Sequence, residues 1–593
     1  MNELQPVALE SEGASADLVL SGGRVYCSNR RTFLERDVAV VGDRIAALPE
    51  DASSVVDSET TVVDANGRVV LPGLIDAHTH VDIYLTPERA VPSLLAAGTT
   101  SMVSETSGLG VLFGSRGVET TLERTAELPL SIYLTLPPQL LVDTFEPVRA
   151  DDAELDALAE LLDRERVVGV GEVDWVHVVG RDSPLERLYE RTRAKGETIV
   201  GHGAGCRGDR LRAFATIVDN DHEAISAEGV RQRAEQGLHV VGRCGSVRDD
   251  LDVLVEAYPD VDRASVSVST DGIWPRDLLE GFGMSEVVRR MIESGVSPAD
   301  AIDAATKNPA AHFGLAGRGV VAPGAFADLL VVENLESMTV ETVVADGAVV
   351  VADGEPTVEP RTDPYPEYVY DTVSVDLEER RFTAPRSAAP ADAVRAMVVD
   401  QGLVTTETTV EPAVRTDLDG ERLVPAPDRD VLTATMIDRN PAVEDRGFTG
   451  FLTGFGLESG AVALTGTWDA TGLVVVAADV EDALVAARRV SSMGGGFAVS
   501  RDGGVVAELA APVAATAVDA PLEDVADGFE RLRRALADGG VELERPLLTL
   551  QTLTFLGVPT LKLTASGYAD VLGRSTVGLD PDSTDVPASA DDR

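Results

Sequence analysis

The chain has 593 residues, of which 100 are acidic and 50 basic, so its formal net charge at pH 7 is −50. A chain of this length exceeds one hydrophobic core and is expected to form about two to four domains. The acidity argues against nucleic acid and anionic membranes as partners, because both repel such a surface. The 44% hydrophobic content argues against general disorder.

The basic residues are almost all arginine, since the only lysines are Lys195, Lys307 and Lys562. We interpret the acidic surface as an adaptation to a high-salt cytoplasm, where counterions screen self-repulsion. In this respect the chain resembles proteins of halophilic archaea. Its three cysteines are scattered, and residues 1–5 lack the features of a secretion signal, so a cytoplasmic location is expected.

The N-terminal part is expected to be disordered over residues 1–15 and then to form strands. Short β-rich runs separated by glycine and polar turns occur within residues 16–71, and the same pattern returns within residues 317–354. We predict that these two segments pair to form one composite β-sandwich domain.

Between them, residues 72–316 alternate between strand-like and helical segments. Helical spacing is found at 88–97, 152–164, 284–293 and 298–306, and strands are indicated at 100–103, 167–170, 239–241 and 264–268. Repeated β–α alternation over roughly 240 residues is typical of a (β/α)8 TIM barrel. The predicted fold class is therefore α/β with a central barrel.

A linker rich in proline and charge is predicted at residues 355–369, followed by a C-terminal α/β (α+β) domain over residues 370–593. About the last 14 residues are expected to be disordered, as chain ends often are. No apolar run is long enough to cross a membrane.

The motif Pro72-Gly-Leu-Ile-Asp-Ala-His-Thr-His80 opens the barrel segment. Side chains on a strand alternate between its faces, so His78 and His80 are expected to point the same way. Two imidazoles on one side of a strand end can hold a divalent metal ion. An ordinary strand that carries two histidines is the alternative, and it is weakened because the chain has only seven histidines.

Four further acid or imidazole residues lie at or just after predicted barrel strands. The carboxyl ends of barrel strands converge on one mouth, so residues far apart in sequence can share a site there. Each one alone could be a helix cap or a loop residue. These residues are Glu172, His202, His222 and Asp271.

With these residues in place, the chain resembles the adenine deaminase family of the amidohydrolase superfamily. The barrel motifs that carry the resemblance are Gly171-Glu-Val173, Gly201-His-Gly-Ala-Gly205 and Asp221-His-Glu-Ala-Ile-Ser226. The most telling motifs lie in the C-terminal part, namely Gly450-Phe-Leu-Thr-Gly-Phe-Gly-Leu457, Met493-Gly-Gly-Gly496 and Pro559-Thr-Leu-Lys-Leu-Thr564. The resemblance covers residues 16 to about 579.

The resemblance implies a centre with two divalent metal ions and a defined set of ligands. His78, His80 and Asp271 would bind one ion, His202 and His222 the other, and Glu172 would bridge them. Manganese is implied, and iron or zinc also suits these ligands. The implied reaction is hydrolysis of adenine to hypoxanthine and ammonia by a metal-bridged hydroxide in purine salvage, with Glu172 and Asp271 as the catalytic residues.

This chain departs from the family pattern at several polar positions. Glu105-Thr-Ser107-Gly replaces Asp-Pro-His-Glu, Cys244 follows Arg243 in place of a glutamate, Gly272 replaces a second aspartate, and Trp468-Asp replaces the start of His-Asp-x-His-Asn. We therefore consider Ser107, Arg243, Cys244 and Trp468 as candidate substrate-binding residues.

Two alternatives to adenine deamination stay open. One is hydrolysis of another cyclic amidine or amide, and the other is ligand binding without turnover. A small-molecule purine is the expected partner, and assembly as a homodimer is compatible with the sequence.

Overall fold

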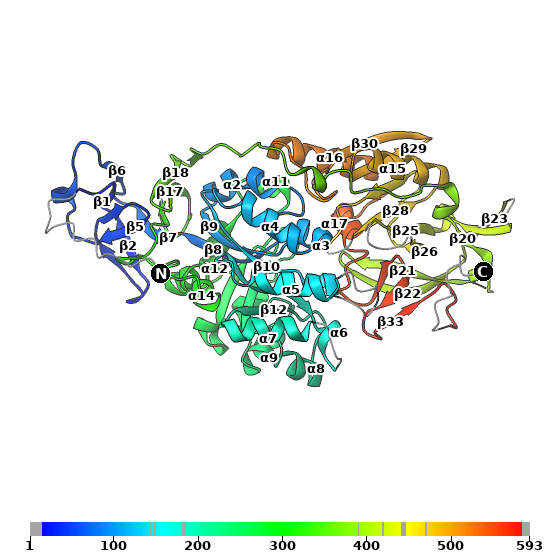
Figure 1. Cartoon of the computed structure of the whole chain (residues 1–593), viewed down its shortest axis with the longest axis horizontal. Coiled ribbons are helices and arrows are strands. Elements are labelled where there is room, and N and C mark those ends of the chain that lie inside the picture. Colours follow the sequence, from blue (N-terminus) through cyan, green and yellow to red (C-terminus); the bar gives the residue numbers. More distant parts are fainter. Residues whose placement is uncertain are drawn as a thin grey trace.

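The computed structural model of the chain describes residues 15–141, 145, 150–180, 185–389, 391–417, 420–439, 446–468 and 471–583. The disorder expected for residues 1–15 and for about the last 14 residues falls almost entirely outside these ranges. Figure 1 shows three bodies in a row, with a small β body, a central barrel and a C-terminal body. None of the described helices is long and apolar enough to cross a bilayer.

The small β body is built by both flanks of the barrel. Strand β7 (Val69–Pro72) pairs in parallel with β2 (Arg24–Cys27) and antiparallel with β16 (Leu329–Val332), which follows the barrel. Buried side chains from both flanks, including Leu18, Val38, Leu329 and Val344, form one hydrophobic cluster. The two segments therefore share a core, which is favourable because neither buries enough apolar surface by itself.

The central body is a ring of eight parallel strands that pair in chain order. The predicted TIM-type barrel is confirmed. The strands are β8 (Leu74–Thr79), β9 (Thr99–Ser104), β10 (Ser131–Leu136), β11 (Val167–Asp174), β12 (Thr198–His202), β13 (Asn220–Asp221), β14 (His239–Arg243) and β15 (Val266–Ser269).

Helices surround these strands, and most lie close to the segments with helical spacing. The helix predicted at 88–97 is α2 (Pro87–Ala96), and the one predicted at 284–293 is α12 (Met284–Glu293). Helix α5 (Asp152–Leu161) ends three residues earlier than predicted, because Leu162 begins a turn whose N–H groups bond to the last helical carbonyls.

The barrel closes between its first and last strands at the end that carries the histidines. The Asp271 backbone N–H donates to the His78 carbonyl (3.0 Å), and Thr79 forms a β-bridge with Asp271. Below this bridge, the Asp76 carboxylate accepts hydrogen bonds from the backbone and the hydroxyl of Thr270. The closure therefore brings the histidine pair and Asp271 together.

Two histidines stack at the opposite end of the barrel. His239 begins β14 and His312 ends α14 (Lys307–His312), and their rings lie 4.1 Å apart with an interplanar angle of 16°. His239 Nε2 lies 2.7 Å from Ser267 Oγ, and Asn220 Nδ2 donates to His312 Nε2. Burial lowers the pKa of His239 well below its usual value and that of His312 to about 4, so both rings are neutral.

The pair makes stability sensitive to mild acid. The unfolded chain binds a proton at His239 near pH 6.5 and the folded chain does not, so stability falls as the pH drops below that value. We expect wild type to lose about 1.5 kcal/mol more of its unfolding free energy between pH 6.5 and pH 5 than His239→Gln. Urea unfolding at fixed salt measures the unfolding free energy at each pH. An equal decrease of this free energy between pH 6.5 and pH 5 in both proteins would contradict the prediction.

The C-terminal body is a mixed α/β unit around an eight-stranded sheet of order β22-β21-β26-β25-β28-β27-β29-β30. Helix α15 (Val480–Ser492) buries Ala483, Ala486 and Val490 against this sheet. The strands are β21 (Val394–Gln401), β22 (Val404–Val410), β25 (Leu432–Asp438), β26 (Gly447–Thr453), β27 (Ala461–Leu464), β28 (Gly472–Ala477), β29 (Gly496–Arg501) and β30 (Gly504–Ala510).

A second helix joins this body to the barrel. Helix α16 (Leu522–Ala537) packs on β30 and against α11 (Pro275–Leu279), the short helix that follows the last barrel strand. An ion pair between Arg276 and Asp527 (2.7 Å) spans the same junction. The C-terminal body is therefore attached next to the barrel mouth.

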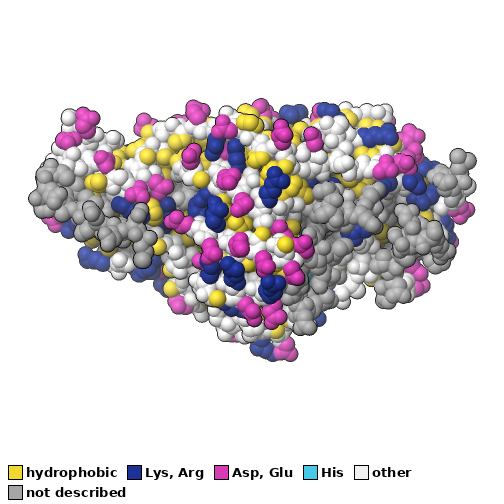
Figure 2. Space-filling view, viewed as in Figure 1, with side chains coloured by type: hydrophobic (Ala, Val, Ile, Leu, Met, Phe, Trp, Pro, Cys, Tyr) yellow, Lys and Arg dark blue, Asp and Glu magenta, His cyan; other side chains and the backbone are white. Residues whose placement is uncertain are grey.

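The surface carries charges of both signs over the face in view. Figure 2 shows acidic side chains spread across this face, with Lys and Arg side chains scattered between them. No broad basic stripe of the kind that follows a nucleic-acid backbone is visible on that face.

Candidate metal centre

Six predicted ligands converge at the barrel mouth, placed there by the ends of five strands. Between 1% and 4% of the surface of each residue is exposed, so the cluster is removed from bulk water. The six are His78 on β8, His80 just after it, Glu172 in β11, His202 at the end of β12, His222 after β13 and Asp271 after β15.

Glu172 stands at the centre of four imidazoles. The Nε2 atoms of His222, His80, His202 and His78 lie 3.4, 3.5, 3.7 and 3.9 Å from its carboxylate oxygens. His222 and His202 approach Oε1 and His80 approaches Oε2. These separations are mostly longer than a hydrogen bond, and all four rings point toward one carboxylate.

Asp271 lies beside the first histidine pair. Its Oδ1 atom is 3.6 Å from His78 Nε2 and 3.7 Å from His80 Nε2. Both Asp271 and Glu172 have positive φ angles, 60° and 31°, a conformation that costs energy for residues other than glycine. Such strain at two converging carboxylates is typical of a functional site.

The imidazole nitrogens that face Glu172 fit a metal site. The Nε2 atoms of His78, His80 and His222 are buried and have no hydrogen-bond partner among the described residues. Leaving three buried nitrogens unsatisfied is unfavourable unless another group binds them. The ligand atoms form three groups within 4.8 Å of one another, namely His78, His80, Glu172; Glu172, His202, His222; and His78, His222, Asp271.

The protonation states of the histidines favour the same conclusion. Burial and the nearby His78 lower the pKa of His80 to about 3, and burial lowers that of His222 well below its usual value. Both rings are therefore neutral, as metal ligands must be. For His202, burial lowers the pKa, but Glu223 and Asp174 outweigh it and raise the pKa well above the usual value. The buried carboxylates thus attract positive charge, which a divalent ion supplies.

The second nitrogen of three ligands faces a supporting oxygen. His80 Nδ1 lies 2.8 Å from Ser107 Oγ, His202 Nδ1 lies 3.1 Å from Asp174 Oδ1, and His78 Nδ1 lies 3.5 Å from Glu105 Oε1. Oxygen partners of this kind fix the orientation of a metal-binding imidazole and raise its basicity. A hydrogen bond thus orients His80, while His202 and His78 each have a carboxylate oxygen near their second nitrogen.

Glu105 and Glu223 were not among the residues predicted for the site. Glu105 follows β9, and its Oε2 accepts a hydrogen bond from Thr135 Oγ1 (2.6 Å). A Cβ atom on Gly171 would lie 1.7 Å from the same oxygen, so only glycine fits beside Glu172. Glu223 Oε1 lies 3.3 Å from His202 Nε2. The sequence offered a signal for each of them, because Glu105 directly follows a strand and Glu223 directly follows the predicted ligand His222.

The four candidate substrate-binding residues occupy different surroundings. Ser107 contacts His80, as described above. Arg243 is 4% exposed and pairs with Glu223 and with Asp250 (2.8 Å), while its Nη1 lies 3.6 Å from Asp271 Oδ2. Cys244 points to the outer helix α12, where Arg290 donates to its sulfur (3.2 Å). Trp468 is the aromatic residue among the four, and its ring lies 4.6 Å from the ring of His80.

The C-terminal body covers the centre. Besides Trp468, it places the ring of Phe555 at 5.3 Å from that of His202. A Cβ atom on Gly557 would lie 2.9 Å from His202 Cε1, so the chain passes close over this ligand. The predicted ligands His80 and His202 are therefore covered by residues from outside the barrel.

Comparison with known proteins agrees with this division of the chain. Residues 69–350 match the amidohydrolase family, and residues 402–574 match the adenine deaminase C-terminal domain. An adenine deaminase of Methanothrix thermoacetophila is 30% identical over 559 residues, which cover 94% of this chain and 95% of that protein. The chain belongs to the adenine deaminase family.

Two further similar proteins are a second adenine deaminase and a solved structure. An adenine deaminase of Kosmotoga olearia is 29% identical over 584 residues, which cover 98% of this chain and 99% of that protein. Among solved structures, a beta-aspartyl dipeptidase of Fervidobacterium islandicum AW-1 is 19% identical with a TM-score of 0.46, covering 58% of this chain and 99% of the dipeptidase. Amidohydrolases use divalent metal ions, and this member of the adenine deaminase family has ligand groups that fit them.

Proposed function

We propose that this protein hydrolyses adenine to hypoxanthine and ammonia in purine salvage and uses two divalent metal ions to do so. The observation that supports it most directly is the ring of four imidazole Nε2 atoms around Glu172, with Asp271 beside it. Full-length similarity to proteins named adenine deaminase supports adenine as the substrate.

The ligand groups suggest how two ions would be shared. His78, His80 and Asp271 would hold one ion, since Asp271 Oδ1 lies near both of these imidazoles. His202 and His222 would hold the other, and Glu172 would contact both. Nitrogen and oxygen ligands of this kind suit Mn2+, our first choice, and also Fe2+ or Zn2+. When bound, such ions lower the pKa of water so that hydroxide is available at neutral pH.

Asp271 is the residue best placed to move protons during the reaction. Burial raises its pKa, but the nearby His78 and Arg243 outweigh this and hold its pKa below the usual value. It is therefore a carboxylate that can accept a proton from the attacking water and pass it to the amino group on C6, which leaves as ammonia. Arg243 keeps this carboxylate in place from the side away from the histidines.

Another cyclic amidine or amide is the second candidate substrate. Ser107 and Arg243 are already bonded to His80, Glu223 and Asp250, which reduces the number of polar side chains available to a purine. A cytoplasmic location and a homodimeric state remain predictions.

An ammonia-release assay tests the function directly. Purified protein loaded with Mn2+ in multimolar KCl is expected to release ammonia from adenine and to form hypoxanthine. Release from another heterocycle, but none from adenine, would favour the second candidate. Protein that binds no divalent metal by elemental analysis would contradict both.

A further inference from the structure

Tyr84 carries a buried hydroxyl that lies close to the Trp468 indole. It lies in the turn after β8, four residues beyond His80, and only 4% of its surface is exposed. Its Oη atom has no hydrogen-bond partner among the described residues. Its ring is fixed edge-on against Trp274 (4.9 Å) and lies near Phe529 (5.9 Å). A rigidly held hydroxyl without a partner is available to a ligand.

Trp468 presents a second group of the same kind from the C-terminal body. It is 3% exposed, and its indole Nε1 also lacks a partner in the part of the chain that the structure describes. Its backbone N–H donates to the Gln551 carbonyl (3.2 Å), and its ring packs on His80. A Cβ atom on Gly272 would lie 3.7 Å from this ring, so the indole lies next to the residue that follows Asp271.

The two polar atoms belong to one location. Burial raises the pKa of the Tyr84 phenol and the Asp271 carboxylate raises it further, whereas hydrogen bonding from the Trp468 indole N–H and the charge of Arg545 lower it. Tyr84 therefore lies within electrostatic reach of the proton-transfer carboxylate, of Trp468 and of an arginine at the surface. The Trp468 indole N–H and the Tyr84 hydroxyl thus lie near each other without the distance and angle of a well-formed hydrogen bond, so a ligand can compete for both.

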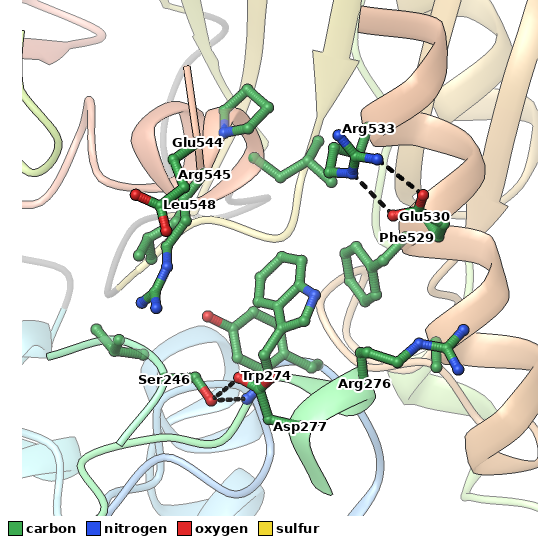
Figure 3. Close-up of a pocket in the computed structure, with 15 residues that line it drawn as sticks. Ser246, Trp274, Arg276, Asp277, Phe529, Glu530, Arg533, Glu544, Arg545 and Leu548 are labelled. Atoms are coloured by element: carbon green, nitrogen blue, oxygen red, sulfur yellow. Dashed lines mark hydrogen bonds and ion pairs between the residues drawn. The ribbon is translucent and has the colours of Figure 1, made fainter. Parts of the chain in front are cut away.

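A cavity of about 200 Å³ lies on the outer side of Tyr84. Figure 3 shows Trp274 and Phe529 side by side in its wall and Arg545 across from them, while Arg533 is paired with Glu530. The Ser246 hydroxyl donates to Asp277 and accepts from the Trp274 backbone N–H, which holds the barrel loop in place. Tyr84 also borders a smaller cavity together with His80. It thus separates the large cavity from the metal ligands.

We propose that Tyr84 and Trp468 recognise the heterocyclic ring of the substrate, and that the cavity beside Tyr84 is the route by which the ring approaches. The assignment rests on the proposed function. The indole N–H can only donate, so it pairs with an unprotonated ring nitrogen, whereas the Tyr84 hydroxyl can donate or accept. An uncharged pair beside aromatic walls suits an uncharged planar ring such as a purine.

The test uses Tyr84→Phe and Trp468→Phe in the full-length, metal-loaded enzyme, since each removes one polar hydrogen and keeps an aromatic ring. Each is expected to raise KM for adenine about tenfold, the worth of one hydrogen bond, with a smaller change in kcat. Tyr258→Phe is the matched control, because Tyr258 is equally buried but sits on the outside of the barrel near Asp300. It should leave KM unchanged.

Adenine analogues that lack one ring nitrogen identify the atoms involved. With 1-deaza-, 3-deaza- and 7-deazaadenine as inhibitors, wild type should bind one of them about tenfold more weakly than the others, and Trp468→Phe should remove that difference. Equal inhibition of wild type by all three would overturn the assignment even if a variant failed to fold. If wild type releases ammonia from another heterocycle only, the proposed function fails, and the KM for that heterocycle tests Tyr84 and Trp468.

Discussion

Replacing Glu172 by glutamine is expected to lower turnover by a factor on the order of 10⁴, as removal of a carboxylate from a catalytic unit can. Four imidazole nitrogens lie 3.4–3.9 Å from this carboxylate, and no other Asp or Glu of the described residues lies within 4.0 Å of all of them. Glutamine keeps the shape but removes the charge that would hold two cations together. Bound metal should therefore fall together with ammonia release.

Metal content by elemental analysis and kcat for ammonia release measure the two effects. Glu165→Gln is the matched control, because Glu165 is exposed on the surface and should tolerate the same change. Full metal occupancy with unchanged kcat in Glu172→Gln would show that the bridging role is wrong.

Asp271→Asn is expected to separate proton transfer from metal binding. Asparagine tolerates the positive φ of 60° at this position, so the backbone should not change. General acid–base catalysis contributes about 10²- to 10⁴-fold to the rate, and we expect kcat to decrease by a factor in that range. Because the other five ligands remain, much of the metal should stay bound.

The comparison with Glu172→Gln makes this prediction specific. A low kcat with retained metal supports proton transfer by Asp271. A loss of metal equal to that of Glu172→Gln would indicate that Asp271 acts as a metal ligand and not in proton transfer. Asp260→Asn, a change at an exposed carboxylate paired with Arg231, serves as the control for an unrelated charge. Circular dichroism of all variants checks that each is folded.

The fold could be predicted from local patterns because they recur along the chain. Apolar strands that alternate with helical spacing predict a parallel barrel, since each strand must cross over through a helix before it meets the next. The pairing of β7 with β16 was likewise expected from matching strand runs on both sides. Strand and helix ends were less predictable, because they depend on hydrogen bonds that form only in the folded chain.

The resemblance of the sequence to a known family implied His78, His80, Glu172, His202, His222 and Asp271 as ligands, and the structure brings all six together. Parallel barrel strands deliver their C-terminal ends to one mouth, so position after a strand was sufficient to predict this convergence. The metal assignments themselves remain proposals.

Tertiary structure alone decided which side chains surround that centre. Arg243 and Ser107 are engaged by neighbours that sequence spacing cannot place, and Trp468 reaches His80 from a different folded body. The unsatisfied hydroxyl of Tyr84 could not be inferred either, because a missing partner becomes visible only after every surrounding group is in position. The convergence of the six residues follows from the order of the barrel strands, which local patterns predict. The pocket follows from packing between bodies, which local patterns do not predict.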